Sequence, residues 1–145
     1  MFASLDIAAS GLTAQRLRLD VIANNLANAE TTRTAAGGPY VRQLVIFAPR
    51  EVPPFSHFLS AAAASQVPGY GVRVVGIVLD QSPPRRVYQP GHPDADAAGY
   101  VAYPNVDVVR EMVDMISASR AYEANAAAFN AAKGMALKAL ELGRR

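Results

Sequence analysis

The stretch LDIAASGLTAQRLRLDVIANNLANA, residues 5–29, decides how this chain folds. Four of its leucines, at positions 5, 12, 19 and 26, stand seven residues apart, and a small or apolar side chain follows three of them at the third position. This spacing predicts a helix with a coiled-coil-like seam. A second apolar row on the other side of the same helix contains Ile7, Ala14, Leu17 and Val21. A helix that is apolar on two sides needs a packing partner on each.

A second long helix is predicted at the other end of the chain. All ten prolines lie between Pro39 and Pro104, so neither end is interrupted. After Pro104, Asn105 is the expected N-cap, and Asp107 suits the positive end of the helix. The apolar seam then advances by steps of four and three residues and comprises Val108, Met112, Met115, Ser119, Tyr122, Ala126, Phe129, Lys133, Ala136 and Leu140.

The middle of the chain reads as short strands and turns. Strands are predicted at 40–47, 71–80 and 86–88, and a mobile loop near 52–68. The stretch SPPRRVYQPGHPDADAAGYVAYPN, residues 82–105, has too much proline and glycine for regular structure, so we expect an ordered extended strap anchored by tyrosines. The predicted fold class is α+β: residues 1–30 and 105–145 pair as a coiled-coil-like helical core for assembly, and residues 31–104 form an inserted β-rich domain.

Composition limits the classes of function. The chain has 145 residues and no cysteine, which excludes a thiolate nucleophile, a disulfide framework and a cysteine-ligated metal. Fourteen basic and twelve acidic residues give a net charge of +2 without a long basic run, so nucleic-acid binding is not expected. The sequence has no apolar run of about 18 residues, so direct membrane insertion is not expected either.

One cluster has side chains that can bind metal. His92, Asp94 and Asp96 alternate in GHPDAD, and histidine with carboxylates can hold a metal ion. A remote alternative is therefore a metal-dependent enzyme. The favoured interpretation is a turn whose polar groups bond to the backbone. We expect no catalytic residues, no cofactor and no metal.

The two ends of the chain resemble a known family. SGLTAQRLRLDVIANNLANAETTRT, residues 10–34, is similar to the N-terminal signature of bacterial flagellar axial proteins. YVAYPNVDVVREMVDMISASRAYEANAAAFNAAKGMALKALELGR, residues 100–144, is similar to their C-terminal signature, and SPPRRVYQPGHPDADAAGY resembles the proximal rod members. Many relatives have isoleucine where this chain has Leu26, a small departure from the pattern.

The resemblance implies a structural subunit of the flagellar basal-body rod, the hollow periplasmic drive shaft that transmits torque. It implies export through the flagellar type III apparatus without a cleaved signal peptide. The implied partners are other rod proteins, the rod base at the MS ring and further copies of the chain itself. Two alternatives remain open: another flagellar axial protein, or a helical adaptor that does not polymerise.

Three asparagines near the end of the first helix need an explanation, because asparagine is a poor residue in a helix interior. One interpretation is helix termination before Thr31. The preferred interpretation is an amide-lined contact with neighbouring subunits. The predicted subunit interface comprises Leu5, Leu12, Leu17, Leu19, Val21, Ile22, Asn24, Asn25, Leu26, Asn28, Met112, Met115, Ile116, Tyr122, Phe129 and Leu140.

Overall fold

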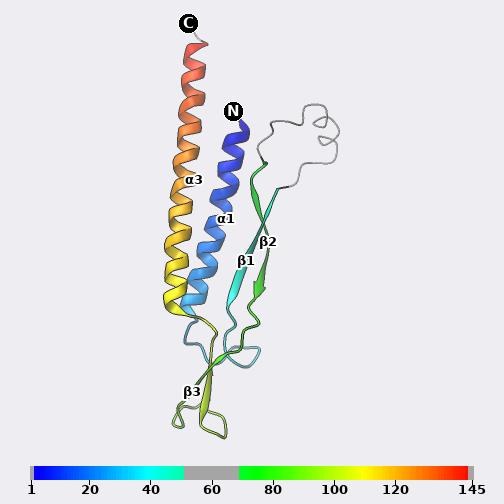
Figure 1. Cartoon of the computed structure of the whole chain (residues 1–145), viewed down its shortest axis with the longest axis vertical. Helices are drawn as coiled ribbons and strands as arrows, with labels where there is room; N and C mark the ends of the chain where they lie inside the picture. The colour runs from blue at the N-terminus through cyan, green and yellow to red at the C-terminus, as the bar shows by residue number, and fades with distance from the viewer. Residues whose placement is uncertain (1, 51–68, 144–145) are drawn as a thin grey trace.

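The computed structural model describes residues 2–50 and 69–143 and confirms the α+β class (Figure 1). Helix α1 (Phe2–Ala27) and helix α3 (Val108–Leu142) run antiparallel, side by side. Strands β1 (Gln43–Pro49) and β2 (Val72–Leu79) form an antiparallel hairpin along the other side of α1. Strands β3 (Arg85–Tyr88) and β4 (Tyr100–Tyr103) form a second hairpin below the helices. The predicted loop at 52–68 lies outside the described residues.

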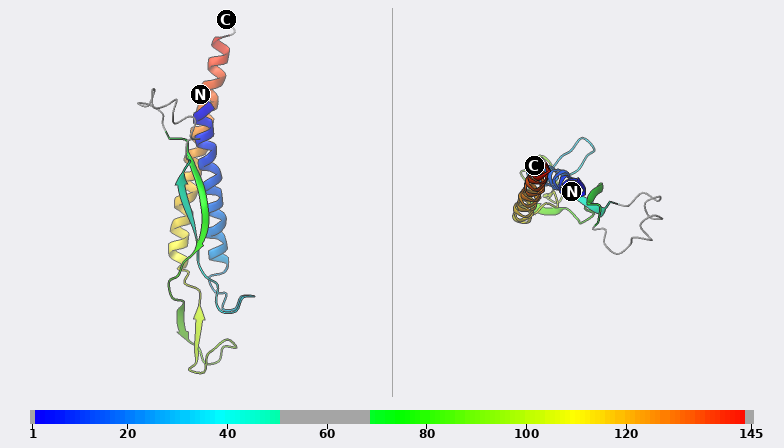
Figure 2. Two further views of the ribbon diagram at one scale, coloured as in Figure 1. Left: turned by 90° about the vertical axis from the view of Figure 1, so that its right-hand side faces the viewer. Right: turned by 90° about the horizontal axis from the view of Figure 1, so that it is seen from above.

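The main body has three layers, with α1 in the middle (Figure 2). Seen from above, α3, α1 and the β1–β2 hairpin lie in a row. Ala14 and Val21, from the second apolar row of α1, are buried. Ser10 Oγ accepts a hydrogen bond from the Val72 amide at 3.1 Å, which ties this side of α1 to β2. The hairpin of the same chain therefore supplies the second partner that α1 requires.

The seam of α3 differs from the predicted one by a single position. Glu111, Ala118 and Ala132 are buried, and Asn125, at the same seven-residue spacing, meets Gly11 of α1. The predicted seam ran one residue later, through Met112, which is more than half exposed. Small side chains allow the two helices to lie close together, whereas Val109, Met112 and Val113 are left exposed.

The N-cap of α3 is a different residue from the predicted one. The N-cap is Asp107, whose side chain accepts hydrogen bonds from the amides of Val109 and Arg110. Asn105 caps nothing and instead donates to the carbonyls of Asp80 and Ser82.

The predicted strap contains a strand that the sequence did not reveal. β4 pairs with β3, with Val87 opposite Val101, and Val101 is fully buried. Tyr88 and Tyr100 pack edge to face with ring centroids 5.3 Å apart. The strand predicted at 86–88 is confirmed as β3. Most of the glycine and part of the proline of this stretch lie in the turn at residues 89–99, and the four residues of β4 are too few for a clear pattern.

Among the described residues, no helix is both long enough and apolar enough to cross a membrane.

Two glycines offer a matched test of the close approach between the helices. A Cβ at Gly11 would lie 2.6 Å from Asn125 Oδ1, whereas a Cβ at Gly134 would meet nothing within 4 Å. Alanine stabilises an unobstructed helix position by about 0.5–1 kcal/mol relative to glycine. We expect Gly134→Ala to raise the free energy of unfolding of the purified chain by this amount. Gly11→Ala should lower it, because Asn125 must move.

Thermal and denaturant unfolding measure both variants. Adding Asn125→Ala to Gly11→Ala should restore stability by removing the clash. An equal gain from both glycine substitutions would contradict the close packing of α1 on α3.

Candidate subunit interface and its buried polar cluster

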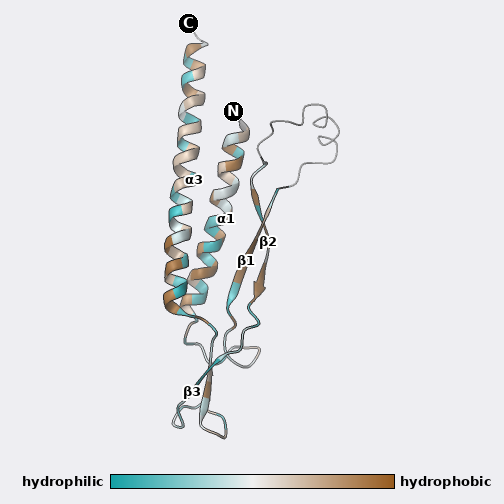
Figure 3. Ribbon diagram, viewed as in Figure 1, coloured by the Kyte–Doolittle hydropathy of each residue, from teal (hydrophilic) through white to brown (hydrophobic). Residues whose placement is uncertain are grey.

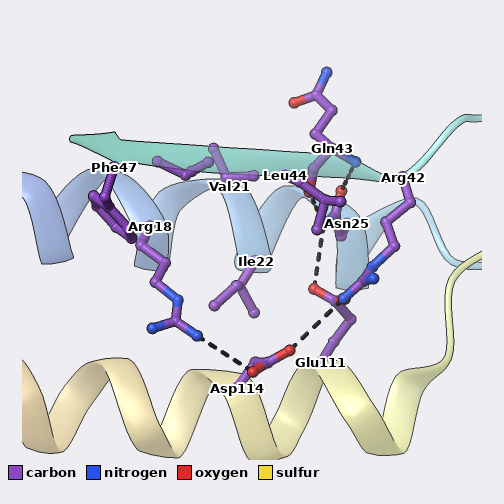
Figure 4. Close-up of a pocket in the computed structure, with 11 residues that line it drawn as sticks. Arg18, Val21, Ile22, Asn25, Arg42, Gln43, Leu44, Phe47, Glu111 and Asp114 are labelled. Carbon is purple, nitrogen blue, oxygen red and sulfur yellow. Dashed lines mark hydrogen bonds and ion pairs between the residues drawn. The ribbon is translucent and has the colours of Figure 1, made fainter. Parts of the chain in front are cut away.

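Asn25 connects three elements from the inside of the molecule (Figure 4). It is 1% exposed. Its Nδ2 donates to the Gln43 carbonyl at 2.8 Å and to Glu111 Oε2 at 3.2 Å. Its Oδ1 accepts from the Gln43 amide and from the Tyr40 hydroxyl, each at 2.9 Å. The amide of Asn25 therefore holds α1 against both β1 and α3.

Arg42 and Glu111 form an ion pair beside Asn25. Arg42 Nε donates to Glu111 Oε1 at 2.7 Å, and Arg42 Nη2 contacts the same oxygen. Arg42 is 7% exposed and Glu111 1%. Two buried charges must be paired and hydrogen-bonded, because removing each from water is costly. The first turn of α3, where the helix dipole favours negative charge, suits Glu111.

Weaker contacts extend this pair into a network. Asp80 Oδ2 lies 3.6 Å from Arg42 Nη1, and Asp114 Oδ2 lies 3.7 Å from Arg42 Nη2. Arg18 of α1 reaches Asp114 Oδ1 at 3.3 Å. We call this set the Arg42 cluster; its members are Arg18, Asn25, Tyr40, Arg42, Asp80, Glu111 and Asp114.

Two members of the cluster have shifted pKa values. Burial raises the pKa of Tyr40 above its usual value of 10.0, and the negative charge of Glu111 raises it further. Hydrogen bonds from the Ser82 hydroxyl and amide lower the pKa of Asp80, with a smaller contribution from Arg42. Tyr40 is therefore held neutral and Asp80 ionised, which are the states that their hydrogen bonds require.

The other two asparagines end the helix. Asn28 Nδ2 donates to the Asn24 carbonyl at 2.9 Å and to Asn24 Oδ1 at 3.0 Å. Thr31 Oγ1 donates to Asn28 Oδ1 at 3.2 Å. The Asn24 carbonyl also accepts the Asn28 backbone amide at 3.1 Å, so these side-chain bonds tie the last turn of α1 to the turn that follows it. The helix-termination interpretation thus has direct geometric support for Asn24 and Asn28.

The predicted interface residues fall into three groups by exposure. Val21, Ile22 and Asn25 are buried within the chain. Half-buried residues are Leu5, Leu12, Leu17, Leu19, Leu26, Asn28, Met115 and Phe129. Exposed residues are Asn24, Met112, Ile116, Tyr122 and Leu140.

The candidate metal residues are engaged in hydrogen bonds within the chain. His92 Nδ1 accepts from the Asp94 amide, and Asp96 Oδ1 accepts from the amides of Ala98 and Tyr100. Asp94 accepts from the Thr32 hydroxyl at 2.9 Å. Within the part of the chain that the structure describes, no three histidine or carboxylate side chains are grouped as metal ligands.

The sequence interpretation missed Arg42, Glu111 and Tyr40. One signal was present for Glu111: it begins a series in which Ala118, Asn125 and Ala132 follow at seven-residue steps. Arg42 carried no comparable signal, because its partner lies 69 residues away.

Large apolar side chains remain exposed along α3. Figure 3 shows hydrophobic residues concentrated in the lower part of this helix. Val109, Met112, Val113 and Ile116 are 52–71% exposed. Contiguous exposed apolar surface marks sites of protein interaction. The fold and its surface define an elongated structural subunit, braced internally by the Arg42 cluster and apolar on its outer sides.

Comparisons with known proteins identify the family. Residues 5–33 match the model described as flagella basal body rod protein, and residues 97–142 match the model described as flagellar basal body rod FlgEFG protein C-terminal. The chain is 51% identical to the flagellar basal-body rod protein FlgC of Borreliella burgdorferi, over 98% of this chain and 97% of that protein.

Two further FlgC proteins agree over nearly their full lengths. The Bacillus subtilis protein is 47% identical, over 99% of this chain and 98% of its own. The Salmonella typhimurium protein is 47% identical, over 96% and 95% respectively. The chain therefore belongs to the FlgC family of flagellar basal-body rod proteins. It is a structural subunit of the proximal rod in the flagellar basal body, not an enzyme.

Breaking the buried ion pair should be costly. We expect Glu111→Gln to lower the free energy of unfolding of the purified chain by about 3–5 kcal/mol, because Arg42 would remain buried with only its longer contacts to Asp80 and Asp114. The double variant Arg42→Met/Glu111→Leu should lose less than the sum of the single variants. Glu123→Gln, the same change at an exposed position of α3, should alter stability by under about 0.5 kcal/mol.

Denaturant unfolding measures all of these variants. Equal small effects at positions 111 and 123 would show that the pair does not brace the fold.

Proposed function

We propose that this chain joins the rod through apolar side chains that its own fold leaves uncovered. The observation that carries this proposal is the free end of α3. Asn25 meets Glu111 and Gly11 meets Asn125, so the last turns of α3 lie beyond the first residue of α1 (Figure 1). On this overhang, Met135, Leu137, Leu140 and Leu142 are 53–77% exposed.

The energetics favour assembly by many such contacts. Burying one large apolar side chain contributes roughly 1.5–3 kcal/mol. A contact between two different surfaces leaves one free surface at each end of the assembly, so further subunits can be added. Such contacts form a helix when they do not close into a ring. Torque would pass along the rod through many of these contacts in parallel.

The partially exposed members of the predicted interface belong to this proposal. Leu5, Leu12 and Leu19 are half-buried on α1, and Met112 and Tyr122 are exposed on α3. The side chains of Val21, Ile22 and Asn25 are buried within the chain, so they are not expected at a subunit contact. Helical residues 1–30 and 105–145 would form the assembly core, with residues 31–104 as the inserted part.

The expected partners and location follow from membership of the rod family. We infer contacts with other rod proteins, with the rod base at the MS ring and with further copies of this chain. The place of assembly would be the periplasm, reached through the flagellar type III export apparatus without cleavage of a signal peptide.

The overhang provides the test of the proposal. In a strain whose only copy carries Leu140→Asp, we expect the protein to be missing from purified basal bodies and motility to be lost, since a charge would be buried in the contact. Leu140→Met retains an apolar side chain of similar size and should assemble. Immunoblots of basal bodies and swimming assays report both outcomes. A motile Leu140→Asp strain with normal incorporation would contradict the proposal.

A further inference from the structure

A groove of about 450 Å³ lies where α1 meets the β1–β2 hairpin. Figure 2 shows the hairpin running along this side of α1. Apolar side chains line the less exposed part of the groove: Leu17, Val72 and Val74 are half-buried, and Ala14 is buried. We call it the α1–β2 groove. Its half-exposed apolar lining gains free energy when another apolar side chain covers it.

Positive charge dominates the rim of the α1–β2 groove. Arg16, Arg50 and Arg73 line the groove and are exposed, against a single carboxylate, that of Asp20. Among the residues that the structure describes, no ion pair joins Arg16 or Arg50 to a carboxylate. A cleft lined by charge of one sign concentrates its electric field and attracts groups of the opposite sign. The groove is therefore suited to a ligand with negative charge.

The two arginines lie at different heights along the groove. The Arg50 amide donates to the Gly71 carbonyl at 2.9 Å, and a Cβ on Gly71 would clash with the Ser10 hydroxyl. The backbone of Arg50 is therefore level with Ser10, and Arg16 is six residues further along α1, a rise of about 9 Å. A ligand that pairs with both must be longer than a single small anion.

The combination of charge and apolar surface fits a protein segment. Arginine forms bidentate, charge-assisted hydrogen bonds with carboxylates, so acidic side chains suit the rim. Apolar side chains of the same segment would cover Leu17, Val72 and Val74. A free anion would leave this apolar lining uncovered. Because the chain is a subunit of the rod, the ligand within reach is a segment of another subunit.

The chain itself offers no such segment among its described residues. Its exposed carboxylates outside the groove are those of Asp6, Glu30, Asp96, Asp107, Glu123 and Glu141. Asp96 accepts from backbone amides, and Asp107 caps α3. The other four are widely separated along the chain, and Arg120 and Lys138 each precede a glutamate by three residues on the same helix face. A second copy would therefore bring single carboxylates, two of them beside cations.

We propose that the α1–β2 groove receives an acidic, partly apolar segment of a different rod protein, whose carboxylates pair with Arg16 and Arg50. The groove goes beyond the apolar contact proposed above for the α3 overhang. The two lie on different elements, and the groove variants below leave the overhang unchanged, so either contact can fail without the other.

Photocrosslinking in assembled rods tests this contact. The photoreactive residue p-benzoylphenylalanine replaces Thr13, which is exposed and lines the groove, in a strain whose only copy carries the change. Purified basal bodies are irradiated, and mass spectrometry identifies the crosslinked peptide. We expect a product with a different rod protein, joined at a segment that contains carboxylates. The same probe at Asn130, an exposed position of α3, should not give this product.

Charge reversal tests the role of the two arginines. Arg16→Glu/Arg50→Glu in the probe strain should lower the product per incorporated chain by about tenfold or more, because attraction becomes repulsion. Arg16→Lys/Arg50→Lys retains the charge and should retain most of the product. Arg86→Glu/Arg120→Glu, the same change of charge at exposed positions outside the groove, should leave the yield unchanged.

A charge swap separates the contact from a folding defect. If Arg16→Glu/Arg50→Glu keeps the protein out of basal bodies, lysines in place of the partner's crosslinked carboxylates should restore incorporation, which they could not do for a misfolded chain. A failed swap would overturn the contact. So would a crosslink from position 13 to a second copy of this chain or to a segment without carboxylates, an undiminished product from the glutamate variant, or no product from incorporated protein.

Discussion

The buried pair of Arg42 and Glu111 is the constraint on which the rest of the structure depends. Arg42 stands immediately before β1, and Glu111 lies in the first turn of α3. Neither charge can be buried alone, so the two elements must meet wherever the pair forms. Asn25 then fixes α1 at the same place through four hydrogen bonds. One cluster therefore sets the relative position of both helices and the hairpin.

This arrangement determines which surfaces are left for other molecules. α3 covers one side of α1 and the hairpin covers the other. The second apolar row of α1 therefore packs inside the chain. Uncovered apolar side chains gather on the outer face of α3, on its overhang and on both sides of β2. Such exposed apolar surfaces are expected of a subunit that assembles with other rod components.

Periodicity was sufficient to predict the two long helices and their pairing, because apolar spacing is a local property of sequence. The strands β1 and β2 were predictable from their valine and isoleucine content. β4 was not, since its pattern is only four residues long. The seam of α3 was placed one residue too late, because large apolar side chains were assigned to the core where Glu111 and alanines lie. A buried glutamate is recognisable only when its partner is known, and Arg42 is 69 residues away.

Native-state hydrogen exchange on the purified chain tests most directly whether the Arg42 cluster joins the three elements into one unit. The amides of Arg42 and Gln43 donate to side-chain oxygens of Asn105 and Asn25, and the Glu111 amide donates within the first turn of α3. If the cluster opens as a unit, these amides should exchange with one shared free energy of opening. Exchange of Arg42 and Gln43 at a much lower free energy than Glu111 would show that the hairpin detaches independently, and would contradict this account.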